Sequence, residues 1–183
     1  MERCSVSTYL QFVEPFYEDK DPAHNFRHIQ RIVERLDLLS SNLSPQPCRE
    51  MLCFLASFHG LAKRMSSSVE FTDTVKNFLL QMGWNEEQIA DGIERLHRHL
   101  KSPLTVEEKI VHDANYVELL GAFGIAKAFT KGGAEGQSYE ETANIFEYRF
   151  LDAVEFQTPI GKQLASEKRA YTKDFFARLR AVL

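Results

Sequence analysis

The sequence predicts an all-α protein that folds as one compact domain over residues 1–183. Apolar residues recur three and four positions apart through most of the chain, which is the spacing of one helix face. Helix-start signals precede several of these runs, and no segment of convincing length alternates as a strand does. The chain is 44% hydrophobic and contains fourteen Phe, which is enough apolar material for one core.

The first strongly periodic run follows Asp21-Pro22, which has the form of an N-cap followed by proline at the first helical position. It predicts a helix over about 22–41. The segment Ser44-Pro45-Gln46-Pro47 then breaks the chain. A second apolar helix is expected after it, over about 47–64.

The later helices are indicated by their starts. Three pairs have the spacing of a capping box before an apolar run: Asn85 with Gln88, Thr105 with Glu108, and Ser138 with Glu141. Ser66 to Ser68 start another helix, and the last one follows Pro159. Three glycines make 131–137 the most flexible-looking loop.

Composition excludes several classes of protein. The net charge is −4 without a basic stripe, so the sequence shows no nucleic-acid or anionic-membrane footprint. No apolar run approaches the length of a membrane span, and the N-terminus does not resemble a secretory signal. Cys4, Cys48 and Cys53 lack CxxC spacing and are expected to be free thiols in a reducing compartment. We therefore expect a cytoplasmic protein.

Two histidine-containing segments could carry chemistry. In the first, His24 and His28 are four residues apart, which places both imidazoles on one helix face, as a metal site requires. A helix cap or a solvated pair would have the same spacing. In the second, His59 ends a strongly apolar helical run, where it could be a ligand or a hydrogen-bonded core histidine.

Asp113 lies one turn inside an otherwise apolar helix. A carboxylate buried there without partners would cost several kcal/mol. It therefore needs a cation, a set of hydrogen-bond donors or exposure to solvent.

Taken together, these segments resemble the HD-domain metal-dependent phosphohydrolase superfamily, in its compact bacterial branch, whose characterised members hydrolyse nucleotides. The opening motif is carried by AHNFRHIQRI, the His-Asp segment by FLASFHGLAK, and the final Asp segment by KIVHDANYVELLGAFGIAKAF. The C-terminal TPIGKQLASEKRAYTKDFFARL resembles the closing helix of that branch. The resemblance spans almost the whole chain and implies an HD-type helical fold.

The resemblance implies a divalent metal ion (Mn, Ni, Co, Fe or Mg) held by His28, His59 and Asp113. Gly60 stands where the family has the Asp of its His-Asp doublet, and glycine has no side chain that can bind a metal. Asn115 likewise replaces the second acid of the final motif. Since a ligating anion is missing, metal affinity should fall, and the metal could be absent altogether.

Asn25 also stands where the opening motif usually has an acid, so the acids that most often serve as proton acceptors are replaced. His24 and His112 are candidate substitutes as general bases.

Other residues fit a pocket for a small phosphate-containing ligand. Lys63 follows His59 by one helical turn and could meet a phosphate oxygen during binding and catalysis, and Arg31 lies three residues past His28. His97 and His99 stand where the family often has a substrate-side histidine. Solvated surface positions would account equally for these residues.

Three functions remain open from the sequence. The first is a hydrolase with an incomplete metal site, acting on a nucleotide or another phosphate ester. The second is a catalytically inactive relative that binds a phosphate-containing ligand or a protein partner. The third is a helical scaffold without a pocket function. The sequence does not specify an oligomeric state.

Overall fold

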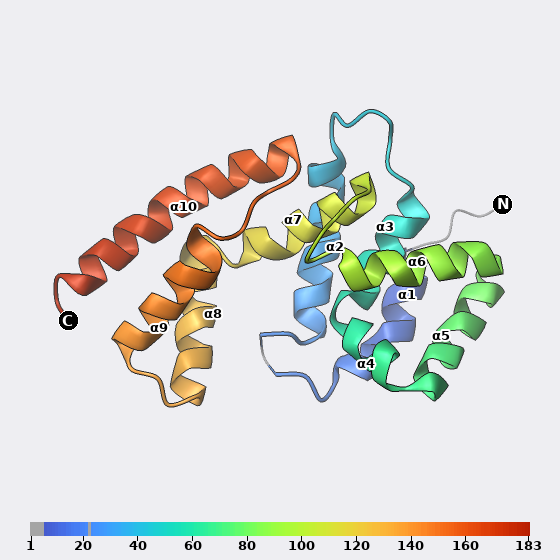
Figure 1. Ribbon diagram of the computed structural model, residues 1–183, viewed down its shortest axis with the longest axis horizontal. Helices are drawn as coiled ribbons and strands as arrows, with labels where there is room; N and C mark the ends of the chain where they lie inside the picture. The colour runs from blue at the N-terminus through green and yellow to red at the C-terminus, as the bar shows by residue number, and fades with distance from the viewer. Residues whose placement is uncertain (1–5, 22) are drawn as a thin grey trace. The chain divides into compact units, whose positions relative to one another are not determined.

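The computed structural model describes residues 6–21 and 23–183, and within these ranges the secondary structure is entirely helical (Figure 1). This confirms the predicted all-α fold class. Cys4 and Pro22, for which the sequence made predictions, lie outside the described residues. Cys48 is an exposed free thiol, as expected, and Cys53 is buried.

The contacts within the chain group into two compact units, Met1–Val111 and His112–Leu183. We call them unit 1 and unit 2. The boundary falls inside α7 (Val106–Glu118). That the whole of 1–183 forms one domain stays a prediction.

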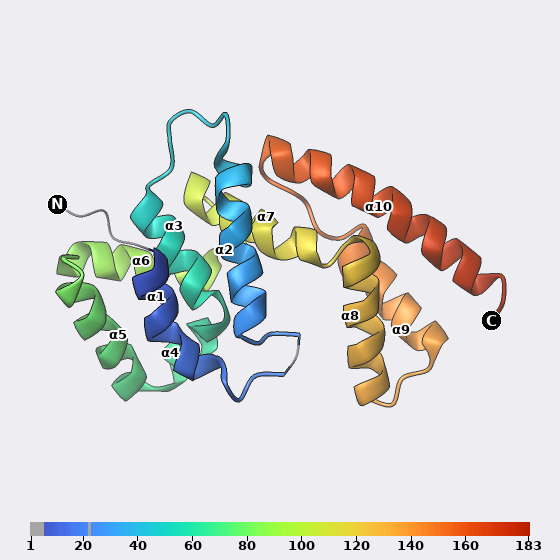
Figure 2. The same ribbon diagram turned by 180° about the vertical axis from the view of Figure 1, so that it is seen from behind.

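Unit 1 is built around α3, whose residues from Met51 to Phe58 are all buried. Helices α1, α2 and α6 pack against α3, as both ribbon views show (Figures 1 and 2). The elements of unit 1 before α7 are α1 (Val6–Val13), a 3-10 turn (Glu14–Tyr17), α2 (Phe26–Ser40), α3 (Arg49–Phe58), a 3-10 turn (His59–Leu61), α4 (Ala62–Ser67), α5 (Val69–Gln81) and α6 (Glu86–Arg98).

Helix α2 begins at Phe26, so the predicted start at about residue 22 is wrong. Asn25 is the N-cap, and its side chain accepts a hydrogen bond from the backbone N–H of His28. Asp21 instead closes a separate turn, in which its carboxylate accepts the N–H of Ala23 at 2.8 Å. Two competing cap residues four positions apart explain the error, because either can start a helix.

The predicted helix over 47–64 is interrupted. Helix α3 ends at Phe58, and a 3-10 turn separates it from α4. At this turn the N–H of Gly60 donates a hydrogen bond to the Tyr17 hydroxyl, 3.1 Å away. A contact with a residue more than forty positions earlier therefore accompanies the change in helix geometry.

A partly buried ion pair joins the end of α6 to the start of α7. Arg98 donates two hydrogen bonds to the Glu108 carboxylate, at 2.7 and 3.2 Å, and the N–H of Thr105 donates a third at 2.8 Å. Burial acts to raise the pKa of Glu108, but the hydrogen bonds from Arg98 and Thr105 outweigh it and hold the pKa below its ordinary value.

We expect Glu108→Gln to lower the free energy of unfolding by about 2 kcal/mol, because hydrogen bonds to a charged group are lost. Because the folded-state pKa is depressed, this contribution is present above the ordinary Glu pKa of about 4.3 and is lost as the pH falls through the folded value. Urea unfolding at pH 7 and at pH 3 checks both parts. The control is Glu94→Gln, which removes an exposed partner of the same Arg98 and should cost less than about 0.5 kcal/mol.

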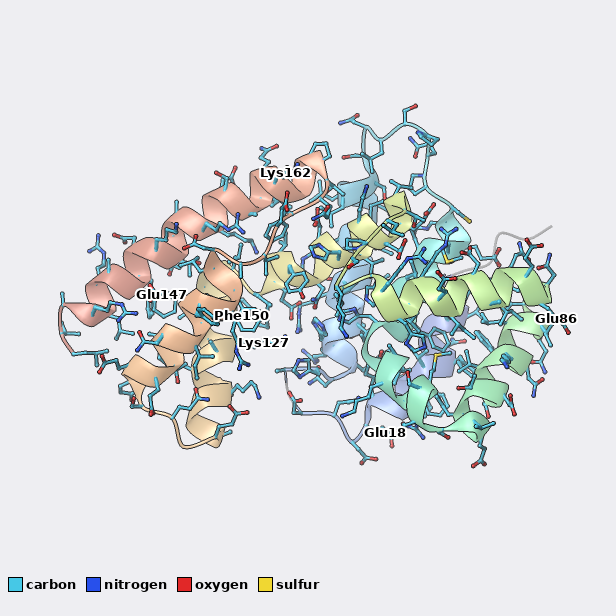
Figure 3. The ribbon with its side chains drawn as sticks, in the orientation of Figure 1. Glu18, Glu86, Lys127, Glu147, Phe150 and Lys162 are labelled. Carbon is cyan, nitrogen blue, oxygen red and sulfur yellow. The ribbon has the colours of Figure 1, made fainter. Side chains whose placement is uncertain are left out.

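Unit 2 contains the end of α7 followed by α8 (Gly121–Ala134), α9 (Tyr139–Phe146), a π-helical turn (Glu147–Leu151) and α10 (Pro159–Arg180). Helix α8 packs against α9 and α10. Lys127 on α8 pairs with the buried Glu118 at 3.6 Å, and Arg180 near the end of α10 pairs with Glu147. Figure 3 labels Lys127 and Glu147. Within the described ranges, no helix has the length and apolar character to cross a membrane.

The predicted loop over 131–137 is mostly helix, because α8 continues to Ala134. Gly132 is buried against α9, and a Cβ at this position would lie 2.1 Å from the Thr142 hydroxyl. The glycine therefore allows close packing of two helices at a point where the sequence alone indicates flexibility.

Candidate functional site

Two of the predicted ligands lie side by side in unit 1. His28, in the first turn of α2, is 2% exposed, and His59 directly follows α3. Their ring centres are 5.5 Å apart and the rings are inclined by 67°. Two imidazoles that bind one metal ion through nitrogens at about 2.0–2.1 Å have ring centres roughly 5 Å apart. The spacing is therefore compatible with a shared ion.

His99 extends this pair into a cluster of three histidines. It caps the end of α6 and is 2% exposed. Its Nε2 lies 2.8 Å from His59 Nδ1, and its Nδ1 lies 2.7 Å from the backbone oxygen of Leu96. His97, on the same helix, is exposed. Of the two candidates, His99 is thus the one that reaches the cluster.

The remaining unit 1 candidates lie nearer the surface. His24 is exposed; its Nδ1 pairs with Asp21 at 2.8 Å, and its ring centre is 6.2 Å from that of His28. Arg31 is partly exposed on α2. His59 is the first residue of the 3-10 turn that separates α3 from α4, and Lys63 is exposed on α4. A role for Lys63 in binding phosphate stays a prediction.

The space beside Gly60 is filled by Tyr17. A Cβ at position 60 would lie 2.8 Å from the ring carbon Cε1 of Tyr17 and 3.1 Å from its hydroxyl. That hydroxyl donates to the backbone oxygen of Ser57 at 2.9 Å and accepts the N–H of Gly60. Burial raises the pKa of Tyr17 far above its ordinary range, and the hydrogen bond with Gly60 opposes this only in part. The phenol is therefore a neutral, fixed group.

The sequence gives no sign of this arrangement, because Tyr17 is more than forty residues from Gly60. A buried aromatic side chain now occupies the place in which a carboxylate at position 60 would begin. The asparagine at position 25 is also engaged, as the N-cap of α2.

Asp113 is fully buried in unit 2 and is surrounded by donors of that unit. Its carboxylate accepts the N–H of Gln157 at 2.9 Å, the N–H of Thr158 at 2.7 Å and the Thr158 hydroxyl at 2.7 Å. His112 Nδ1 lies 3.0 Å from the same carboxylate. An ionised carboxylate offers about four acceptor positions, and four donors are present.

These bonds connect Asp113 to the start of α10. The Thr158 hydroxyl, which donates to Asp113, also accepts the N–H of Gly161 and so caps the helix. A Cβ at Gly161 would lie 2.1 Å from Asp113 Oδ2, so glycine is needed there for the approach. His112 is buried, and its ring centre lies 4.6 Å from that of Tyr116, with the two rings tilted relative to each other. Asn115 is half-buried on α7.

Among the described residues, no group of three or more His, Cys, Asp or Glu side chains is arranged to hold a metal ion. Gly60 stands where the motif of the resembling family has a carboxylate after His59, and the carboxylate of Asp113 accepts hydrogen bonds from backbone and side-chain donors. The set of residues therefore does not fit the carboxylate-containing metal site of the family. The part that fits is the pair of imidazoles, His28 and His59.

Comparison with known proteins places the chain in a family. No protein-family model matches it. It is 31% identical over 189 residues to the uncharacterised protein YpgQ of Bacillus subtilis, with 92% of this chain and 88% of that protein aligned.

Solved structures agree with this relationship. The Lin1889 protein of Listeria innocua matches with a TM-score of 0.76 and 25% identity, over 96% of this chain and 93% of that one. An HD-superfamily hydrolase from Bacillus thuringiensis matches with a TM-score of 0.76 and 24% identity, over 96% and 94%. B. subtilis YpgQ in complex with ADP matches with a TM-score of 0.74 and 21% identity, over 98% of both chains. The chain therefore belongs to the family of YpgQ, and its fold is that of an HD-superfamily hydrolase.

Proposed function

We propose that this protein binds a nucleotide or another phosphate ester and has lost the metal-dependent hydrolysis of its superfamily. The observation that carries the proposal is the Tyr17 side chain, which occupies the space beside Gly60. Ligand binding is supported by the family relationship, since B. subtilis YpgQ has been crystallised with ADP.

Loss of hydrolysis follows from the charge of the residues that remain. HD-superfamily hydrolases are generally metal-dependent. His28 and His59 are neutral when they act as ligands, so they do not offset the charge of a divalent ion. Glycine at position 60 removes one ligating anion. In addition, at least one hydrogen bond from Gln157 or Thr158 to the Asp113 carboxylate would have to break before that carboxylate could bind an ion. Each change lowers metal affinity.

The second candidate function is slow hydrolysis with a metal held by His28, His59 and Asp113. The separation of 5.5 Å between the rings of His28 and His59 favours it. His24 and His112 are the general-base candidates under this alternative.

Calorimetric titration with ADP, paired with a phosphate-release assay, separates the two candidates. We expect ADP to bind with an affinity that EDTA does not change. We also expect no release of phosphate from nucleoside di- and triphosphates in the presence of Mn²⁺, Ni²⁺, Co²⁺ or Mg²⁺.

His59→Ala should weaken ADP binding by about tenfold, the effect of one lost hydrogen bond or contact. His97→Ala, which changes an exposed histidine outside the cluster, should leave the affinity unchanged. Turnover that His59→Ala abolishes and His97→Ala preserves would establish the second candidate instead.

A further inference from the structure

A chain of hydrogen bonds runs from the end of α6 to His59. The backbone oxygen of Leu96 lies 2.7 Å from His99 Nδ1, and His99 Nε2 lies 2.8 Å from His59 Nδ1. A carbonyl oxygen can only accept, so His99 Nδ1 carries a proton. In neutral imidazole the other nitrogen is then an acceptor. His99 Nε2 therefore accepts, and His59 Nδ1 must donate.

This assignment determines the chemistry of the other nitrogen of His59. With its proton on Nδ1, neutral His59 has a lone pair on Nε2. We propose that His99 is a positioning residue that holds His59 in the Nδ1-protonated tautomer and makes its Nε2 a Lewis base.

The acceptor is fixed in place by its surroundings. His99 is 2% exposed, and its own N–H bonds the oxygen of Arg95 as the cap of α6. The preceding residue, Arg98, donates two hydrogen bonds to the buried carboxylate of Glu108. Ordering His59 therefore requires little further loss of side-chain freedom when a ligand arrives.

The tautomer restricts what His59 can bind. An ionised phosphate oxygen needs a donor and would meet a lone pair at Nε2, whereas a metal ion, or a hydroxyl or amino group of a nucleotide, can use that lone pair. Because imidazole nitrogens suit Ni²⁺, Cu²⁺ or Zn²⁺ better than Mg²⁺ or Mn²⁺, the pair His28 and His59 should prefer the first group. The inference goes beyond the proposed function, because it holds whether or not a nucleotide binds.

The tautomer can be observed directly in the full-length, untagged protein. Long-range ¹H–¹⁵N spectra of histidine-labelled protein at pH 8.5, where ordinary imidazole with a pKa of about 6.5 is neutral, distinguish the two protonation patterns. The His59 signals are identified by their loss in His59→Asn. We expect the Nδ1-protonated form in the natural protein and in the control His97→Leu. We expect a mixture in His99→Leu.

His99→Gln should restore the natural pattern, because its side-chain oxygen can accept from His59 Nδ1. A natural protein whose His59 carries its proton on Nε2 would overturn the proposal, and this measurement needs no substitution. A His99→Leu spectrum identical to that of the natural protein would overturn it as well.

Binding of Ni²⁺ alone, measured calorimetrically without nucleotide, gives a second readout. We expect His99→Leu to weaken the tightest Ni²⁺ site by about 10–100-fold, as for other residues that orient a metal ligand. His99→Gln should recover most of that loss, and His97→Leu should show none. Equal losses in His99→Leu and His97→Leu would contradict a positioning role. ADP is absent from both experiments. If the ADP titration shows no nucleotide binding, it contradicts the proposed function but does not affect this inference.

Discussion

Asp113→Ala is expected to lower the free energy of unfolding by about 3 kcal/mol or more. The alanine leaves the N–H groups of Gln157 and Thr158 and the Thr158 hydroxyl without their acceptor. Each buried donor that loses its partner costs about 1–3 kcal/mol. Urea unfolding followed by circular dichroism measures the total, and hydrogen exchange locates it. Exchange should accelerate most at Thr158 and Gly161, where α10 starts.

The control for this prediction is Asp174→Ala. Asp174 is an exposed acid on α10 that pairs with Arg178 one turn away, and its loss should cost less than about 0.5 kcal/mol. Asp113→Asn should be intermediate, because the amide keeps one acceptor oxygen but turns an NH₂ group toward the donors. If Asp113→Ala unfolds at the same urea concentration as Asp174→Ala, the carboxylate is not an anchor for α10.

The anchor has a consequence for any binding assay. A loss of metal or nucleotide affinity in Asp113→Ala would follow from the disturbed start of α10 as readily as from a lost ligand. Hydrogen exchange in α10 distinguishes these causes, because removal of a ligand alone would leave the exchange of Gly161 unchanged.

Features specified within one helical turn could be predicted from the sequence. The starts of α6 and α9 follow from Asn85 with Gln88 and from Ser138 with Glu141, and both capping boxes are present. These signals work because the N-cap and the third helical residue bond to each other's backbone. They need no information from the rest of the chain.

Features that depend on distant residues could not be predicted in the same way. The break after Phe58 involves Tyr17, and the role of His99 involves His59, in each case some forty residues away. A periodicity argument continues the helix through Lys63, because Leu61 and Met65 keep the apolar spacing. The break in the helix is seen only in the folded structure, where Tyr17 contacts the turn at Gly60.

Asp113 lies between these cases. The sequence predicts that a carboxylate inside an apolar helix needs a cation, donors or solvent, and it cannot choose among them. Unit 2 supplies the donors, from a segment more than forty residues later in the chain. Metal binding by Asp113 stays a prediction.

Restoring the missing carboxylate is expected to fail in Gly60→Asp and to succeed once Tyr17 is also shortened. In the single variant the new Cβ meets a ring carbon at 2.8 Å. The ring cannot easily move, because Tyr17 is 2% exposed and its hydroxyl is bonded to Ser57 and Gly60. Overpacking of this kind costs about 1–3 kcal/mol. Gly60→Ala introduces the same Cβ without a charge and should show the same loss of stability.

Tyr17→Leu removes the outer part of the ring and keeps an apolar side chain at this position. We expect Gly60→Asp with Tyr17→Leu to bind Mn²⁺ at least about tenfold more tightly than the natural protein in equilibrium dialysis, because a carboxylate is the type of ligand that Mn²⁺ prefers. Either single variant should resemble the natural protein, so the two changes should be strongly non-additive. If Gly60→Asp alone binds Mn²⁺ as tightly as the double variant, Tyr17 does not block the position. Loss of the metal site would then come from the glycine alone, and one substitution would reverse it.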